Sequence, residues 1–118
     1  MQSILTPYSF FSESVEISGK ILVPEKVIIP EGGLDVVLLK FVVNEQGEIT
    51  TTGPQARVKS QPDGSFRILE VPRDLRAAYR IGTRVEGRPH QSNVVFLNDQ
   101  DSIYQIEVQV PGLSLIHI

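Results

Sequence analysis

Residues 61–79 constrain the possible folds more tightly than any other part of this chain. The tripeptide Pro62-Asp63-Gly64 predicts a turn, because proline presets φ, aspartate caps its own backbone and glycine accepts a positive φ. Phe66 and Ile68 then alternate with polar residues, which is the pattern of a half-buried strand. Strand and turn signals this closely spaced predict an all-β module.

The same alternation recurs along most of the chain. The segments that we expect to be strands are 15–23, 34–43, 49–52 with 56–60, 66–69, 79–85, 92–97 and 104–110. About seven short strands with no convincing helix predict a Greek-key β-sandwich of two packed sheets. We expect Phe66, Ile81 and Ile106 in its interior.

Several segments carry more specific expectations. In residues 34–43 both sets of alternate positions are largely apolar. We therefore expect a central strand with both faces at least partly covered. Residues 49–60 are more polar and are split by Gly53-Pro54, which predicts an edge strand with a bulge or break. Turns are expected at 44–47, 87–89 and 98–101, and a crossover that can hold one helical or 3₁₀ turn at 71–77.

Tyr79 opens its strand four residues after Leu75. A tyrosine at such a corner can bury its ring and bond its hydroxyl to the preceding connection, as in the tyrosine corners of Greek-key sandwiches. The alternative is a catalytic tyrosine, and the sequence supports the corner better.

Composition bounds the organisation of the chain. At 118 residues, with 41% hydrophobic and 21% charged residues, the chain is expected to hold one soluble β-sandwich domain at residues 14–112. No apolar run is long enough to span a membrane. The N-terminal extension, residues 1–13, lacks the pattern of a signal peptide. Cysteine is absent, which excludes disulfides and thiolate metal sites.

The net charge is −3, but its distribution is uneven, because all seven arginines lie between residues 57 and 88. We take Arg80, Arg84 and Arg88 as a possible face for an anionic partner. The alternative is a solvated sheet face balanced by nearby acids. A nucleic-acid partner is not expected, since such modules are usually net positive with interleaved aromatic residues.

The order of these signals resembles the carboxypeptidase regulatory-like domains, which share the transthyretin-like (prealbumin-like) sandwich. The matching segments are 18–21, 32–38, 62–68, 71–72 and 79–81, and together they cover about residues 15–111. The resemblance implies a non-catalytic accessory or adhesion-type module, with a transthyretin-like or immunoglobulin-like fold, in a larger bacterial protein. It also implies a periplasmic or cell-surface location.

Some proteins of similar fold are enzymes or form cross-links, and their functional residues are missing here. Hydroxyisourate hydrolases have several histidines and a C-terminal Tyr-Arg-Gly-Ser, and intradiol dioxygenases bind iron with two tyrosines and two histidines. Surface domains with Lys–Asn isopeptide bonds need an inward lysine on the first strand. Lys20 alternates with Gly19 and Ile21, which we expect to face the core, so Lys20 should face outward.

Other candidate residues favour no chemistry. His90 is a lone histidine in a predicted turn, and Asn98, Asp99 and Asp101 lack the ligand spacing of a calcium loop. The serines considered as nucleophiles lack a Gly-x-Ser-x-Gly context; they are Ser14, Ser60 and Ser92. We therefore expect no cofactor, no metal and no enzymatic activity.

Residues 113–118 read like the translation of an adaptor used in sequencing libraries. We interpret them as a non-native tail, so His117 is not taken as a ligand. The alternative is a genuine apolar terminal strand.

The sequence thus favours a structural or interaction module whose partners are neighbouring domains or another protein. The alternative is a ligand-binding module. Carbohydrate is less favoured because tryptophan is absent and most Phe and Tyr residues fall on core parities. Peptide capture at the polar edge near residues 50–60 remains open.

Overall fold

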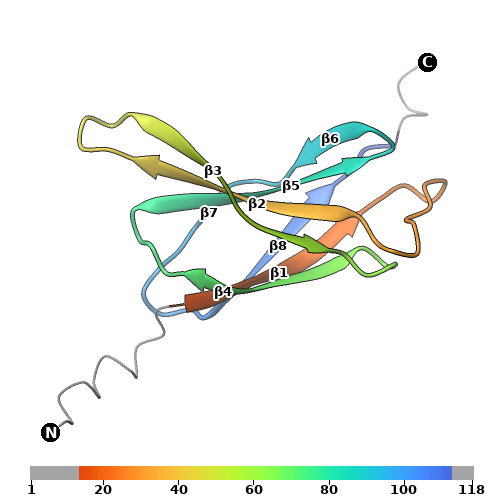
Figure 1. Ribbon diagram of the computed structural model, residues 1–118, viewed down its shortest axis with the longest axis horizontal. Helices are drawn as coiled ribbons and strands as arrows, with labels where there is room; N and C mark the ends of the chain where they lie inside the picture. Colours follow the sequence, from red (N-terminus) through yellow and green to blue (C-terminus); the bar gives the residue numbers. More distant parts are fainter. Residues whose placement is uncertain (1–13, 113–118) are drawn as a thin grey trace, which may run out of the picture.

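The computed structural model describes residues 14–112 and, within them, consists of two β-sheets without a helix (Figure 1). The strands are β1 (Ser14–Leu22), β2 (Asp35–Val43), β3 (Ile49–Lys59), β4 (Ser65–Pro72), β5 (Ala77–Val85), β6 (Arg88–Gln91), β7 (Val95–Phe96) and β8 (Ile103–Gln109). Within residues 14–112, the prediction of an all-β architecture with two layers is confirmed.

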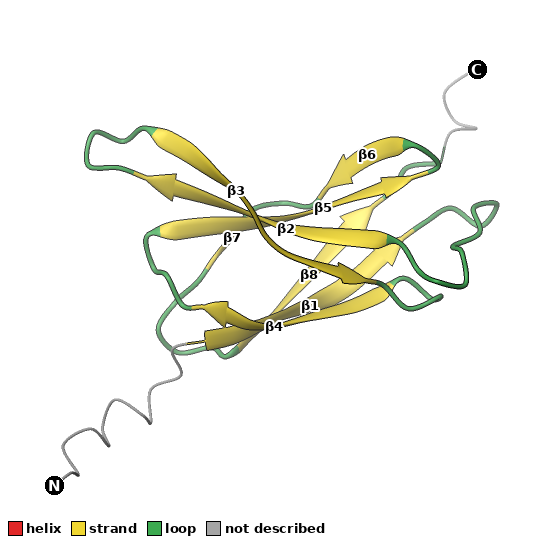
Figure 2. Ribbon diagram, viewed as in Figure 1, coloured by secondary structure: helices red, strands yellow, loops and turns green. Residues whose placement is uncertain are grey.

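The two sheets contain three and five strands. The first has the order β4-β1-β8, with β1 antiparallel to β4 and parallel to β8. The second has the order β3-β2-β5-β6, and the short β7 also pairs with β5. Figure 2 shows the two sheets stacked, with the β2–β3 hairpin extending beyond the other strands at one end.

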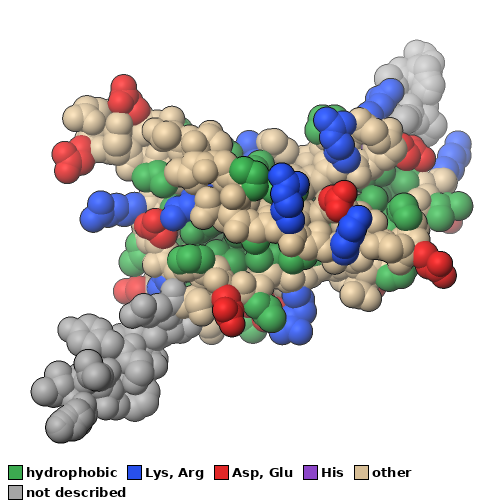
Figure 3. Space-filling view, viewed as in Figure 1, with side chains coloured by type: hydrophobic (Ala, Val, Ile, Leu, Met, Phe, Trp, Pro, Cys, Tyr) green, Lys and Arg blue, Asp and Glu red, His purple; other side chains and the backbone are tan. Residues whose placement is uncertain are grey.

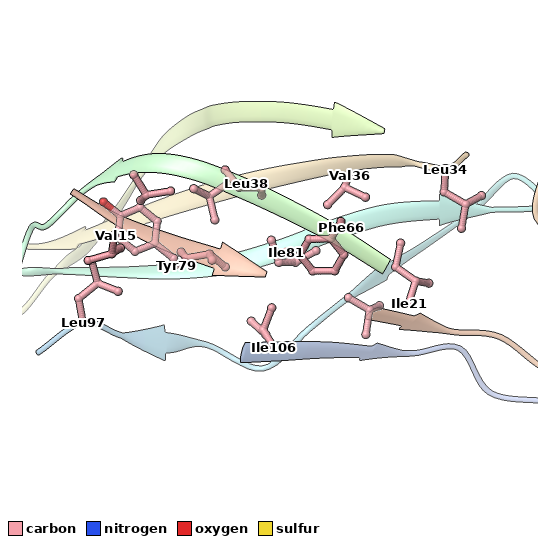
Figure 4. Close-up of a cluster of buried hydrophobic side chains, with 14 of the residues drawn as sticks. Val15, Ile21, Leu34, Val36, Leu38, Phe66, Tyr79, Ile81, Leu97 and Ile106 are labelled. Atoms are coloured by element: carbon pink, nitrogen blue, oxygen red, sulfur yellow. The ribbon is translucent and has the colours of Figure 1, made fainter. Parts of the chain in front are cut away.

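The core lies between the sheets and is built from the alternate residues of each strand (Figure 4). Phe66, Ile81 and Ile106 are 4%, 0% and 6% exposed, which confirms their predicted burial. The remaining core side chains are Val15, Ile17, Ile21, Leu34, Val36, Leu38, Ile68, Val71, Ala77, Tyr79, Val85, Leu97 and Val108. Burial of this apolar surface is the main force that holds the two layers together.

Tyr79 forms the predicted corner. Its side chain is 1% exposed, and its hydroxyl donates a hydrogen bond to the carbonyl oxygen of Pro72 at 3.2 Å. The bond ties the start of β5 to the end of β4, and these two strands belong to different sheets. The tyrosine therefore fixes the connection between the layers.

The strand at 49–60 is an edge strand, as predicted, because β3 pairs only with β2 in its sheet. The two expected pieces form one continuous strand. Its register against β2 shifts between Leu38 and Leu39 and again between Lys40 and Phe41, opposite Gly53-Pro54. Gly53 has a φ of 89°, so the expected irregularity is a pair of bulges and not a break.

The predicted turn at 87–89 and the predicted strand at 92–97 were both wrong in their bounds. The turn expected at 87–89 is a two-residue turn at Glu86-Gly87, where both residues have positive φ, 53° and 82°. Such a pair matches the twist of a tight hairpin. As a result β6 begins at Arg88, and of the strand expected at 92–97 only β7 forms.

The crossover after β4 holds no helical turn. Asp74 closes a hydrogen-bonded turn instead, because its carbonyl oxygen accepts from the Ala77 amide and its side chain accepts from the Arg76 amide.

Residues 14–112 contain no helix with the length and apolarity needed to cross a membrane. The expected extension at 1–13 and the expected tail at 113–118, with His117, lie outside the described residues.

Candidate functional site: an apolar groove on the outer face of the larger sheet

A groove lies on the outer face of the five-stranded sheet, the face that points away from the core. Phe41 on β2 is the cross-strand neighbour of Ala78 on β5, and Ala78 is in turn the neighbour of Phe96 on β7. Cross-strand neighbours project to the same face of a sheet. The small Ala78 side chain therefore forms a hollow between two large aromatic side chains.

The groove has a volume of about 300 Å³ and is almost entirely apolar. Val43 and Ile49, which pair at the end of the β2–β3 hairpin, form one wall. Val94 and Phe96 form the other. Seven large hydrophobic side chains are exposed in the described part of the chain, and three of them line this groove: Val43 at 42%, Ile49 at 70% and Phe96 at 69%.

Arg80 is the one charged residue among the residues that line the groove. Its guanidinium carbon lies 5.9 Å from the centroid of the Phe41 ring, within the range of a cation–π contact. Its Nη1 donates to the side-chain oxygen of Gln91 at 3.0 Å. Its Nε is buried and has no hydrogen-bond partner among residues 14–112.

The structure does not bring the three predicted arginines together in one site. Arg80 and Arg84 share the outer parity of β5, but Arg84 lines a different hollow, beside Lys59, and donates to the carbonyl oxygen of Gly87. Arg88 lies on β6 opposite Val85, so it shares the face of Val85 and not the outer face of Arg80 and Arg84. On the face seen in Figure 3, acidic and basic side chains are interspersed.

A second cluster of polar groups lies at one end of the sandwich. Lys40 is on the inner parity of β2, opposite Tyr79, and its Nζ lies 3.0 Å from Oδ2 of Asp74. The hydrogen bond between them raises the pKa of Lys40 and lowers that of Asp74. Burial raises the pKa of the Tyr79 hydroxyl. All three groups therefore keep their ordinary ionisation states at neutral pH, which suits an ion pair better than a nucleophile or base.

The remaining candidates from the sequence lie in strands and turns. His90 lies on β6 opposite Thr83, and not in the turn where we expected it. The side-chain oxygen of Asn98 accepts from the amides of Gln100 and Asp101, both at 2.8 Å, and so closes the 98–101 turn. Lys20 is exposed, as predicted.

Two of the candidate serines, Ser60 and Ser92, use their hydroxyl groups as hydrogen-bond acceptors for backbone amides. The Ser60 hydroxyl accepts from the Leu34 amide, and the Ser92 hydroxyl accepts from the Ile81 amide, both at 2.9 Å. Each hydroxyl also donates to a neighbouring carbonyl oxygen. Among residues 14–112 no group of three or more His, Cys, Asp or Glu side chains could hold a metal ion.

Sequence reasoning missed the groove because most Phe and Tyr residues were expected to face the core. Phe66 and Tyr79 do lie in the core, and Tyr104 packs against it, but Phe41 and Phe96 lie on the outer face. The sequence did contain a signal for the outer position of Phe41. In β2, Val36 and Leu38 occupy one set of alternate positions and Phe41 belongs to the other, so only one of the two sets can face the core.

No family model matches this chain, and no curated protein is detectably similar to it in sequence.

Proposed function

We propose that this protein is a non-catalytic β-sandwich module that binds a neighbouring domain or another protein through the groove on the outer face of its larger sheet. The observation that carries the proposal is the convergence of Val43, Ile49 and Phe96 at one hollow. Exposed apolar side chains that gather in one place, unlike those scattered singly, are typical of a binding surface.

The chemistry of the groove favours a polypeptide over a carbohydrate. A sugar needs several hydrogen-bonding groups beside an aromatic platform, but six of the seven lining residues are apolar. Aliphatic and aromatic side chains of a partner would fill the hollow over Ala78 and remove the surrounding surface from water.

Peptide capture at the β3 edge is less well supported. Two register shifts and Gly53-Pro54 interrupt β3, and Pro54 has no amide hydrogen to donate. Irregularities of this kind commonly protect an edge strand from pairing with another chain.

The resemblance to carboxypeptidase regulatory-like domains supports a role as an accessory module in a larger bacterial protein, in the periplasm or at the cell surface. In this role the sandwich is a rigid scaffold, and specificity lies in the surface that it presents.

The proposal can be tested by selecting binders from a random peptide library displayed on phage. Selected peptides should lose binding to the variant Phe96→Ser, which removes one wall of the groove. They should keep binding to Ile103→Ser, a control that removes a similarly exposed side chain, 56%, from β8 of the other sheet. Peptides that bind both variants as they bind the wild type would refute the groove as the binding surface.

A further inference from the structure

We propose that the partner segment presents a carboxylate side chain between apolar side chains, and that this carboxylate pairs with Arg80. The inference rests on the proposed function, because it names the chemistry of the ligand for the same groove. It makes Arg80 the residue that determines the specificity of a surface that is otherwise apolar.

The first argument is that Arg80 has a charge without a counterion. Its contacts are the neutral amide of Gln91 and the ring of Phe41. No carboxylate lies within ion-pair distance of it among the described residues, where the ion pairs are Lys40–Asp74, Lys59–Asp35 and Arg67–Glu16. A guanidinium surrounded by apolar side chains gains most from an anion that is buried beside it.

The second argument is the geometry of the Arg80 guanidinium, which has one edge without hydrogen bonds. Arg67 shows how an arginine of this protein binds a carboxylate: its Nε and Nη2 donate to the two carboxylate oxygens of Glu16, at 3.3 and 3.1 Å. In Arg80 the Gln91 amide occupies Nη1, and neither Nε nor Nη2 bonds to any residue in 14–112. The edge that binds a carboxylate with two parallel hydrogen bonds is therefore unused. Because Nε is covered, a small rotation of the side chain must accompany binding.

The third argument concerns what surrounds the cation. Phe41 lies against one face of the guanidinium. The hollow over Ala78 is next to Arg80, because both residues are on β5 and face the groove. A side chain two residues away along an extended partner segment points to the same face as the carboxylate. Such a segment would place its carboxylate on Arg80 and an apolar side chain in the hollow at the same time.

Two matched peptides test this inference. Both are blocked at their ends, with valine and leucine around a central position and serines at each terminus for solubility. One carries glutamate at the centre, and the other carries glutamine. Their affinities are measured by two-dimensional amide NMR titration of the full chain, with the wild type, Arg80→Met and Arg84→Met. Arg84 is the matched control, because it has the same parity on β5 but lies outside the groove.

We expect the glutamate peptide to bind the wild type about fivefold to tenfold more tightly than the glutamine peptide, as for one charge-assisted contact. This preference should disappear in Arg80→Met, persist in Arg84→Met and shrink when salt is raised from about 50 mM to about 500 mM. As a check that needs no variant, the Nε–H signal of Arg80 should shift with the glutamate peptide alone.

The opposite outcomes separate the two proposals. If both peptides shift the groove amides with equal affinity, the carboxylate inference is wrong and the groove remains a binding surface. If the preference for glutamate survives in Arg80→Met, another cation is responsible and the role of Arg80 is wrong. If neither peptide shifts any groove amide, both proposals are refuted.

Discussion

Gly19 shows how a single residue permits the packing of the smaller sheet. It pairs with Ile106 across the parallel β1–β8 ladder. A Cβ atom built on Gly19 would lie 1.6 Å from the carbonyl oxygen of Ile106, a distance that no side chain can adopt. Because the obstacle is backbone, the clash cannot be relieved by a change of rotamer, and β8 can approach β1 only if this position is glycine.

We predict that Gly19→Ala destabilises the protein by about 3 kcal/mol or more, since it forces the β1–β8 ladder apart. The measurement is urea denaturation followed by circular dichroism. Gly32→Ala is the control, because a Cβ at Gly32 meets nothing within 4 Å, and it should change stability little. Equal stability of the two variants would contradict this account of the sheet.

The Tyr79 hydroxyl offers a second test at the residue scale. We predict that Tyr79→Phe lowers the free energy of unfolding by about 1 kcal/mol, because it removes one partly buried hydrogen bond to Pro72 and keeps the ring in the core. Thermal denaturation measures the difference. An unchanged melting temperature would mean that the hydroxyl does not hold the corner.

At the scale of elements, the β2–β3 hairpin connects local turn chemistry to the groove. The side-chain oxygen of Asn44 accepts from the amides of Gln46 and Glu48, and its amide group donates to the Glu48 carboxylate. Val43 and Ile49, which wall the groove, lie on either side of this turn. The turn therefore fixes the position of one wall.

We predict that Asn44→Ala loosens the end of this hairpin with only a modest effect on global stability. Hydrogen exchange of the amides at 43–49 should accelerate severalfold, because local opening becomes easier while the core is unchanged. Exchange in β8 serves as the internal reference. If the hairpin amides exchange as in the wild type, the Asn44 side chain does not order this turn.

The ion pair between Lys40 and Asp74 joins β2 to the β4–β5 connection, and it predicts a pH dependence. Its hydrogen bond lowers the pKa of Asp74 from 3.8, so the stability that it contributes is present above that value and is lost as pH falls through the lowered pKa. The pKa of Lys40 is raised from 10.5, so its contribution is complete below that value and is lost as pH rises through the raised pKa. The pair should stabilise the fold between these limits.

We therefore expect Asp74→Asn to lower the free energy of unfolding by about 1 to 2 kcal/mol at neutral pH, a value between those of exposed and buried ion pairs. The loss should be smaller in strong acid, where the wild-type carboxylate is itself protonated. Urea denaturation of the variant and the wild type across this pH range measures the difference. A penalty that does not depend on pH would show that the lost contact is not electrostatic.

At the scale of the whole molecule, the sequence was sufficient for features that depend on local patterns. Alternation predicted the layers and the burial of Phe66, Ile81 and Ile106, and the position of Tyr79 predicted the corner. The Glu86-Gly87 turn was missed because Glu86 adopts a positive φ, which residues other than glycine adopt only rarely.

The groove depends on information that a single sequence does not contain. Its hollow exists because Phe41, Ala78 and Phe96 are neighbours across three strands, and that register is set by pairing between distant parts of the chain. Arg80 could be named from the sequence as a candidate for an anionic partner. That it lacks a carboxylate and lies beside an apolar hollow depends on the folded structure.

The most direct test of the central claim is to map where a selected peptide binds the wild-type chain in solution. Amide signals should shift for Phe41, Val43, Ile49, Ala78 and Phe96 as peptide is added, while those of β4, β1 and β8 stay in place. Saturable shifts confined to the smaller sheet or to the β3 edge, with the groove signals unmoved, would contradict the account.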